Sequence, residues 1–204
     1  MNPRLVRRAF LTLKKDARMA RLIKRYGKPD FKKGKSAYPA LISAIIYQQL
    51  SGKAAATIYK RFCTIYGTKL PTPHAVLTTP LLKLRKAGLS GQKAAYLKDL
   101  SKKFLDGTID PKHFKEMTDE SIREHLMRVK GVGRWTADMF LMFTLHRMDV
   151  FPSGDLGIQK GMQKVCKLSS LPSPKKIERL SEIWAPYRTI ASWYLWRLAD
   201  ELAG

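Results

Sequence analysis

Asp155 is the residue whose type and position in this sequence most clearly suggest chemistry. It ends the stretch Phe151-Pro152-Ser153-Gly154-Asp155 and precedes a segment with helical character that runs to about Lys167. At the N-cap of that helix, backbone N–H groups would hold its carboxylate in place. A carboxylate fixed in this way can stabilise developing positive charge or orient a water molecule, or it can serve only as a cap.

A glycine hairpin precedes this aspartate in the chain. Gly131-Val132-Gly133 separates two amphipathic segments within residues 126–138. Glycines allow another molecule to approach the backbone closely, and the N–H groups of such a turn and of the following helix start form a site for phosphate. Such contacts hold a nucleic-acid backbone without reading its sequence. The residues expected to contact phosphate are Lys130, Gly131, Val132, Gly133, Arg134, Lys53, Gly91 and Lys93.

The overall charge also indicates a polyanionic partner. The chain has 39 Lys and Arg against 16 Asp and Glu, a net charge of +23. Nucleic acid is the simplest partner for such a chain, and a membrane surface is the alternative, although no concentrated basic amphipathic segment supports it. Cys63 and Cys166 stand alone, so we expect no disulfide, zinc site or iron–sulfur cluster, and no cofactor. They are interpreted as core thiols in a reducing compartment.

The elements that must position these residues are all helical. Apolar residues recur at helical spacing and no segment alternates as a strand does, which predicts an all-α fold. Leu41, Ile42, Ile45 and Ile46 predict a deeply buried helix. The other expected helices cover residues 3–26, 54–66, 92–105, about 119–127, 135–145, 155–167, a segment from Ser173-Pro174 to near Trp184, and a last helix from Pro186. In helix 92–105 we expect core positions at Ala95, Leu97, Leu100 and Phe104, and solvent positions at Lys93, Lys98, Lys102 and Lys103.

With these motifs in order, the sequence resembles the helix-hairpin-helix DNA glycosylases, in the branch of 3-methyladenine DNA glycosylase II. The matching pieces are Ile45 to Ala55, Arg85 to Ala94, Val129 to Ala137, Phe151 to Asp155 and Trp184 to Arg188. The resemblance covers roughly residues 35–200. It implies two lobes, roughly 1–35 with 135–204 and 36–134, with the active site in a cleft between them. It implies the compact form of the family, without an N-terminal β domain.

The resemblance implies base excision from double-stranded DNA that contains alkylated bases. The lesion is turned out of the duplex, and water cleaves its N-glycosidic bond beside Asp155, which stabilises positive charge on the sugar. Bifunctional relatives carry a nucleophilic lysine where this chain has Trp135, and an indole cannot form a Schiff base, so no lyase activity is expected. Trp135 and Trp196, joined by Tyr47, are the expected base pocket, because electron-rich rings stack well on cationic 3-methyladenine and 7-methylguanine. Met139 replaces a tyrosine of some members.

The family fills the gap left by the flipped base from the loop after the buried helix. This loop maps to Gln48, Gln49, Leu50 and Ser51, among which Ser51 is preferred. No catalytic metal is expected, and the carbonyls of Val129 and Gly131 are candidate ligands of a monovalent ion. We expect a monomer that does not bind membranes and is not secreted, cytoplasmic at the nucleoid in a bacterium or nuclear in a eukaryote. The alternatives are a DNA-binding protein without enzymatic activity and a glycosylase for another damaged base.

Overall fold

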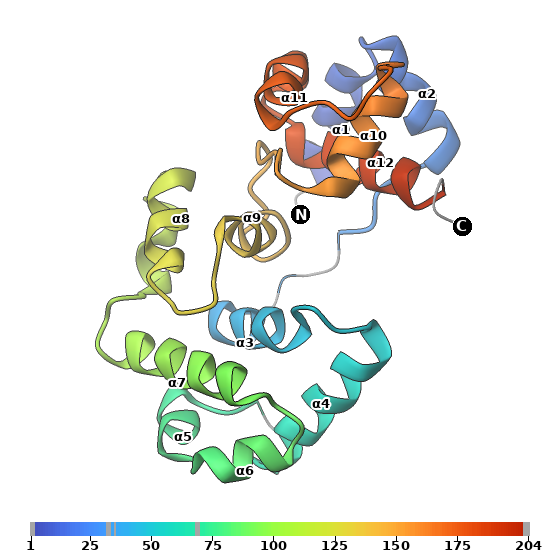
Figure 1. Ribbon diagram of the computed structural model, residues 1–204. Helices are drawn as coiled ribbons and strands as arrows, with labels where there is room; N and C mark the ends of the chain where they lie inside the picture. Colours follow the sequence, from blue (N-terminus) through green and yellow to red (C-terminus); the bar gives the residue numbers. More distant parts are fainter. Residues whose placement is uncertain (1–2, 32–33, 35, 68–69, 202–204) are drawn as a thin grey trace. The chain divides into compact units, whose positions relative to one another are not determined.

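The computed structural model describes residues 3–31, 34, 36–67 and 70–201. This described part of the chain is all helical, without a strand, which confirms the predicted all-α fold (Figure 1). None of its helices combines the length and apolarity needed to span a bilayer. The helices are α1 (Pro3–Leu13), α2 (Ala17–Tyr26), α3 (Ala37–Tyr47), α4 (Gly52–Thr64), α5 (Pro73–Thr78), α6 (Leu81–Lys86), α7 (Gly91–Leu105), the 3-10 helix η1 (Pro111–Lys115), α8 (Asp119–Met127), α9 (Arg134–Phe143), α10 (Leu156–Val165), α11 (Pro174–Ser181), the 3-10 helix η2 (Glu182–Trp184) and α12 (Arg188–Glu201).

The chain forms two compact units, and each has its own helices. Unit 1 comprises residues 1–34 and 141–204, and unit 2 comprises residues 35–140. The chain passes from unit 2 to unit 1 inside α9, after Phe140, whereas the sequence placed this boundary after residue 134. Because α9 is one continuous helix, the boundary between the units is set by which residues its two ends contact, and no loop marks it.

Unit 2 is built around α3. Leu41, Ile42, Ile45 and Ile46 are fully buried, as their apolar run predicts. Helix α7 packs along α3, α5 and α6 and closes this core. Thr118 caps α8 as predicted, because its hydroxyl accepts a hydrogen bond from the backbone N–H of Ser121 at 3.2 Å.

The expected orientation of α7 was wrong in part. Ala94, not Ala95, lies in the core with Leu97 and Leu100, while Ala95 is exposed. Since Leu97 and Leu100 lie in the core as expected, the error concerns the position of one alanine. Two lysines that were expected in solvent, Lys93 and Lys98, contact neighbouring parts of the unit. Lys98 donates a hydrogen bond to the carbonyl of Leu77 at 2.7 Å.

Unit 1 is built around the close pair α10 and α12. Gly161 on α10 allows this approach, because a Cβ atom there would lie 2.5 Å from the carbonyl oxygen of Leu195. Ile158 and Met162 on the same helix are fully buried. The largest fully buried side chains of this core are Tyr194 on α12 and Trp184 on η2.

Two expected helix boundaries in unit 1 were wrong. Residues 3–26 form two helices rather than one, because the Asp16 carboxylate accepts hydrogen bonds from the backbone N–H groups of Arg18 and Met19 and starts α2. Asp favours N-caps over helix interiors, so it interrupts an otherwise helical pattern. Pro186 does not begin the last helix, because α12 starts at Arg188.

Candidate active site

Asp155 is the N-cap of α10, as the sequence predicts. Its Oδ1 atom accepts a hydrogen bond from the backbone N–H of Ile158 at 2.9 Å. The same atom accepts a second hydrogen bond, 2.8 Å long, from Nε1 of Trp196 on α12. The carboxylate is thus held by the start of one helix and by a side chain 41 residues later in the chain.

Gly157 makes the contact between Trp196 and Asp155 sterically feasible. A Cβ atom at this position would lie 2.8 Å from Cδ1 of Trp196 and 3.1 Å from Oδ1 of Asp155. Gly157 and Gly161 are four residues apart and therefore lie on the same face of α10, the face that meets α12. Sequence reasoning missed Gly157, although two glycines at this spacing within one short helix are a recognisable signal for close helix packing.

The loop that leads to Asp155 is tied to the start of α12. Arg188 donates to both carboxylate oxygens of Asp149, at 2.8 and 2.7 Å. The hydroxyl of Thr189 donates to the carbonyl of Arg147 at 2.7 Å and accepts from the backbone N–H of Val150 at 3.0 Å. Arg188 belongs to the last of the five motifs that carry the family resemblance, and these contacts give it a positioning role.

Aromatic rings surround Trp196 within unit 1. The ring of Phe143 lies 6.1 Å from that of Trp196, and Phe31 stacks on Phe143 at 5.9 Å. The three rings form an aromatic row that begins at the Asp155 carboxylate. Phe31 and Phe143 were not among the expected site residues, because they come from a loop and a helix end that the sequence does not connect.

In unit 2, the glycine hairpin is a tightly packed turn. Gly131 has a φ of +80°, and a Cβ atom there would lie 2.1 Å from the ring of Tyr96, so glycine is required on both grounds. The backbone N–H of Lys130 donates to the Asp99 carboxylate at 2.8 Å. That N–H group is therefore engaged within the unit, whereas Gly133 has open space around its α-carbon.

Asp99 connects the hairpin to α7 electrostatically. Its carboxylate also accepts a hydrogen bond from Nζ of Lys103 at 2.7 Å. Burial raises the pKa of Asp99, but the hydrogen bonds from Lys103 and from the N–H of Lys130 outweigh burial and lower it. Neither Tyr96 nor Asp99 was predicted as part of the site, because nothing local in α7 indicates a distant turn.

The loop after α3 is fastened to the hairpin and to α7. Nε2 of Gln48 donates to the carbonyl of Gly131 at 2.8 Å. Nζ of Lys93 donates to the carbonyls of Ile46 and Gln48, at 2.8 and 2.7 Å, and burial lowers its pKa. Lys93, expected as a phosphate contact, thus binds the C-terminal carbonyls of α3.

The tip of this loop is formed by Gln49 and Leu50. Both are exposed, and Gln49 has a φ of +53°. Ser51, the preferred residue for filling the gap, caps α4, since its hydroxyl accepts a hydrogen bond from the N–H of Ala54 at 3.4 Å. The neighbouring Tyr47 is exposed at the end of α3 and meets Tyr59 edge to face at 6.2 Å.

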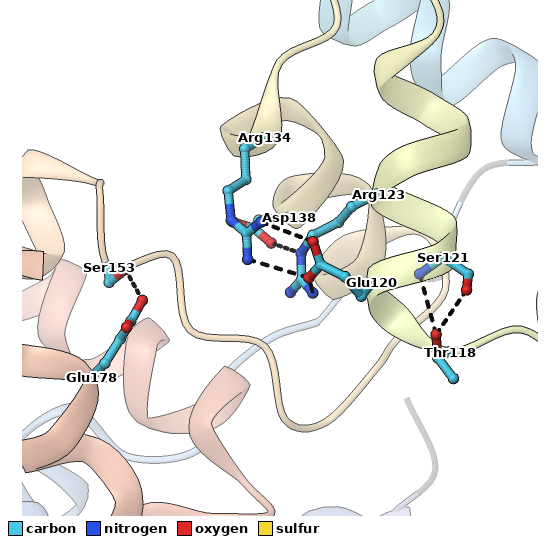
Figure 2. A network of polar contacts seen from close by, with 8 residues as sticks. All are labelled: Thr118, Glu120, Ser121, Arg123, Arg134, Asp138, Ser153 and Glu178. Carbon is cyan, nitrogen blue, oxygen red and sulfur yellow. Dashed lines mark hydrogen bonds and ion pairs between the residues drawn. The ribbon is translucent and has the colours of Figure 1, made fainter. Parts of the chain in front are cut away.

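Arg134, the first residue of α9, belongs to a network of four charged side chains (Figure 2). It donates to Glu120 at 3.0 and 3.3 Å, and Arg123 joins Glu120 to the buried Asp138. The hydrogen bond from Arg134 lowers the pKa of Glu120, whereas burial raises the pKa of Asp138. An incoming phosphate would compete with Glu120 for Arg134.

The other expected residues lie at the following places. Trp135 lies in the first turn of α9 and is 52% exposed. Lys53 is exposed in the first turn of α4, and Gly91 is exposed at the start of α7. Val132 is buried beneath the turn. The carbonyl of Val129 accepts from the N–H of Val132 at 3.0 Å, and a monovalent ion at the hairpin carbonyls stays a prediction.

Comparison with known proteins identifies the family. A model of the HhH-GPD superfamily of base excision DNA repair proteins matches residues 42–186. The chain is 37% identical over 188 residues to DNA-3-methyladenine glycosylase 1 of Schizosaccharomyces pombe, with 90% of this chain and 82% of that protein covered. The chain therefore belongs to the HhH-GPD superfamily, as the resemblance in sequence implied.

Solved structures show the same fold. The chain is similar to the Schizosaccharomyces pombe 3-methyladenine DNA glycosylase in complex with abasic DNA, with a TM-score of 0.83, 35% identity, and coverage of 95% of this chain and 97% of that chain. A DNA-3-methyladenine glycosidase from Bacillus halodurans gives a TM-score of 0.86 at 32% identity, with 94% and 88% covered. These likenesses confirm the helix-hairpin-helix glycosylase fold predicted from the sequence.

Proposed function

We propose that the protein is a monofunctional DNA glycosylase that releases alkylated purines, such as 3-methyladenine and 7-methylguanine, from double-stranded DNA. The observation that carries this proposal is the Asp155 carboxylate, fixed by Ile158 and Trp196 in a member of a base excision repair family. Cleavage of the N-glycosidic bond builds positive charge on the sugar, and a preorganised carboxylate stabilises that charge or orients the attacking water. The names of the similar proteins support alkylated bases as substrates.

The test is base release from methylated duplex DNA by the full chain. Asp155→Asn keeps an oxygen that can accept from Ile158 and Trp196 but removes the charge, so we expect release to fall by at least about 100-fold while DNA affinity is retained. Asp200→Asn, an exposed residue of α12, is the matched control and should release bases at the wild-type rate. Undiminished release by Asp155→Asn would refute the role assigned to this carboxylate.

The absence of lyase activity is proposed from Trp135. A Schiff base with the abasic sugar requires an amine, and the indole at this position of the hairpin motif offers none. The product should be an intact strand with an abasic site. Treating the reaction with borohydride should trap no covalent protein–DNA adduct, and strand scission before alkali is added would contradict the proposal.

We propose that the exposed loop tip, Leu50 with Gln49, fills the gap left by the flipped base. This proposal replaces the preference for Ser51, whose hydroxyl is engaged as a helix cap. Leu50→Ala should slow base release, because apolar surface that would replace the base in the stack is lost. Ser51→Ala should lower the free energy of unfolding by about 1 kcal/mol through the lost cap and change release less. Slower base release by Ser51→Ala than by Leu50→Ala would indicate that Ser51 fills the gap.

A further inference from the structure

Unit 1 has many more basic than acidic residues, and none of its basic residues has yet been assigned a contact with DNA. Unit 1 carries 21 Lys and Arg against 8 Asp and Glu. All of the residues expected to touch phosphate, including the hairpin, belong to unit 2. A charge excess of this size is costly unless a polyanion compensates it.

Part of this excess lines a groove between α2 and α10. Arg18, Arg21 and Arg25 are spaced at three and four residues, and so form one stripe on α2. A hollow of about 210 Å³ lies between this stripe and two lysines, Lys164 near the end of α10 and Lys167 just after it. An adjoining hollow of about 670 Å³ shares the two lysines and is also lined by Lys160. We call these two hollows together the α2–α10 groove.

The groove contains cations that the fold itself does not neutralise. Arg18 pairs with Asp16, and Arg25 pairs with Glu201. Among the described residues, no acid forms an ion pair with Arg21, with Lys160 and Lys164 of α10, or with Lys167 just after it, and no acid lines either hollow. Like charges three or four residues apart on a helix destabilise it, so this pattern does not serve stability.

Lys167 adds a second, independent observation. It has a φ of +53° and follows α10 in the position where helices most often end with glycine. The N–H of Leu168 returns to the carbonyl of Gln163 at 2.9 Å, which completes the glycine-type helix ending. A lysine is therefore held in a left-handed conformation that it adopts at a cost, on the rim of the groove, where its side chain adds charge.

We infer that the α2–α10 groove binds the phosphodiester backbone of DNA away from the damaged nucleotide. Its apolar floor, formed by Leu22, Val165 and Leu198, lowers the competition from water, and its rim supplies Arg and Lys for phosphate oxygens. Asp155 and Lys167 stand at opposite ends of α10, about 18 Å apart along the helix axis. The groove therefore contacts either the same duplex several base pairs from the lesion or a second duplex.

The test compares two triple variants of the full chain that remove equal charge. Lys160→Gln, Lys164→Gln and Lys167→Gln together empty one side of the groove. Lys102→Gln, Lys112→Gln and Lys115→Gln together are the control, on exposed residues of unit 2. Affinity for an undamaged 24-base-pair duplex is measured against salt concentration, so the result does not depend on catalysis or on the proposed function.

The groove variant should show a shallower dependence of log K on log salt, by about 2 to 3, because each lost phosphate contact reduces the slope by about 0.9. The control should keep the wild-type slope. Lys167→Gly, which also relieves the backbone, should raise the melting temperature while weakening binding at 0.1 M salt by about eightfold. Equal salt slopes for the groove and control variants would overturn the inference. It would also be overturned if the groove variant lost binding to anionic vesicles while its DNA binding stayed unchanged.

Fluorescence energy transfer between two differently labelled duplexes then shows whether the groove binds the flanking part of the same duplex or a second duplex. Transfer that the wild-type protein induces and the groove variant does not identifies a second duplex. If no transfer occurs and the slopes differ for 24 but not for 10 base pairs, the groove binds the flanking part of the same duplex. Both results support the groove as a DNA site.

Discussion

Replacing Trp196 with phenylalanine removes the indole N–H that donates to Asp155 but leaves an aromatic ring in place. A ring that only stacks on the damaged base would be replaced well by phenylalanine. A donor that fixes the carboxylate would not be, because the 2.8 Å hydrogen bond to Oδ1 disappears. The variant therefore separates a stacking role of Trp196, expected from the sequence, from a positioning role indicated by the structure.

The magnitude follows from the kind of hydrogen bond. A hydrogen bond to an ionised group contributes about 1.5–3 kcal/mol. If this energy holds the carboxylate where positive charge develops, its loss slows base release by about 10- to 100-fold, since each 1.4 kcal/mol is tenfold in rate. Asp155 keeps its hydrogen bond from Ile158, so the helix cap survives and the protein remains folded.

Single-turnover release of methylated bases is the appropriate assay, because it isolates the chemical step. Trp193→Phe is the matched control, since Trp193 also lies on α12 but contacts Tyr194, at 5.1 Å, and Arg197, at 5.0 Å. It should release bases at nearly the wild-type rate. Equal rates for Trp196→Phe and the wild-type protein would refute the positioning role.

Gly157→Ala breaks the same contact from the other side. Its new methyl group would meet Cδ1 of Trp196 at 2.8 Å and displace the indole. Release should fall as in Trp196→Phe, and the double variant should be little worse than either single one, because both remove one interaction. Gly154→Ala, with nothing within 4 Å of the added carbon, is the control. Additive losses would mean that the glycine acts through something other than Trp196.

Three further predictions concern unit 2. Gly131→Ala should lower the free energy of unfolding in urea by about 2 kcal/mol or more, because the added methyl collides with Tyr96 and the backbone has a positive φ. Lys93→Met should slow base release without changing the salt slope of DNA binding, because its ammonium binds carbonyls of α3. The pKa of Asp99 is lower in the folded protein than in the unfolded chain, where it is about 3.8. Its contribution to stability is therefore complete above about pH 3.8 and is lost as the pH falls further. In urea titrations below about pH 3.8, Asp99→Asn should lose less stability with falling pH than the wild-type protein does.

Each of these predictions has a distinct contrary result. Gly133→Ala, with open space around it, should be nearly neutral, and equal losses at both glycines would remove the argument from Tyr96. A salt slope reduced by about 0.9 in Lys93→Met would identify Lys93 as a phosphate contact after all. Unchanged acid sensitivity in Asp99→Asn would show that another carboxylate dominates below pH 3.8.

Local signals in the sequence determined the helices and several of their ends. Thr118 and Asp155 cap α8 and α10 as expected, because a cap is made by a side chain with backbone two or three residues away. The apolar run in α3 predicted its burial for a similar reason, since periodicity along one segment reports how much of that segment faces a core. Asp16 shows the limit of local signals. Aspartate is a good N-cap, but the apolar periodicity on both sides of it predicted one helix where the structure has two.

The partners of the site residues depended on the tertiary structure. Trp196 reaches Asp155 because Gly157 and Gly161 bring α12 close to α10, and Lys93 reaches the end of α3 because α7 packs against α3. The carboxylate and the hairpin could be predicted from single motifs, and the family from the order of five motifs along the chain. The hydrogen bond on Asp155 and the fastening of Gln48 to Gly131 join residues far apart in the chain, and only packing decides which distant side chains meet.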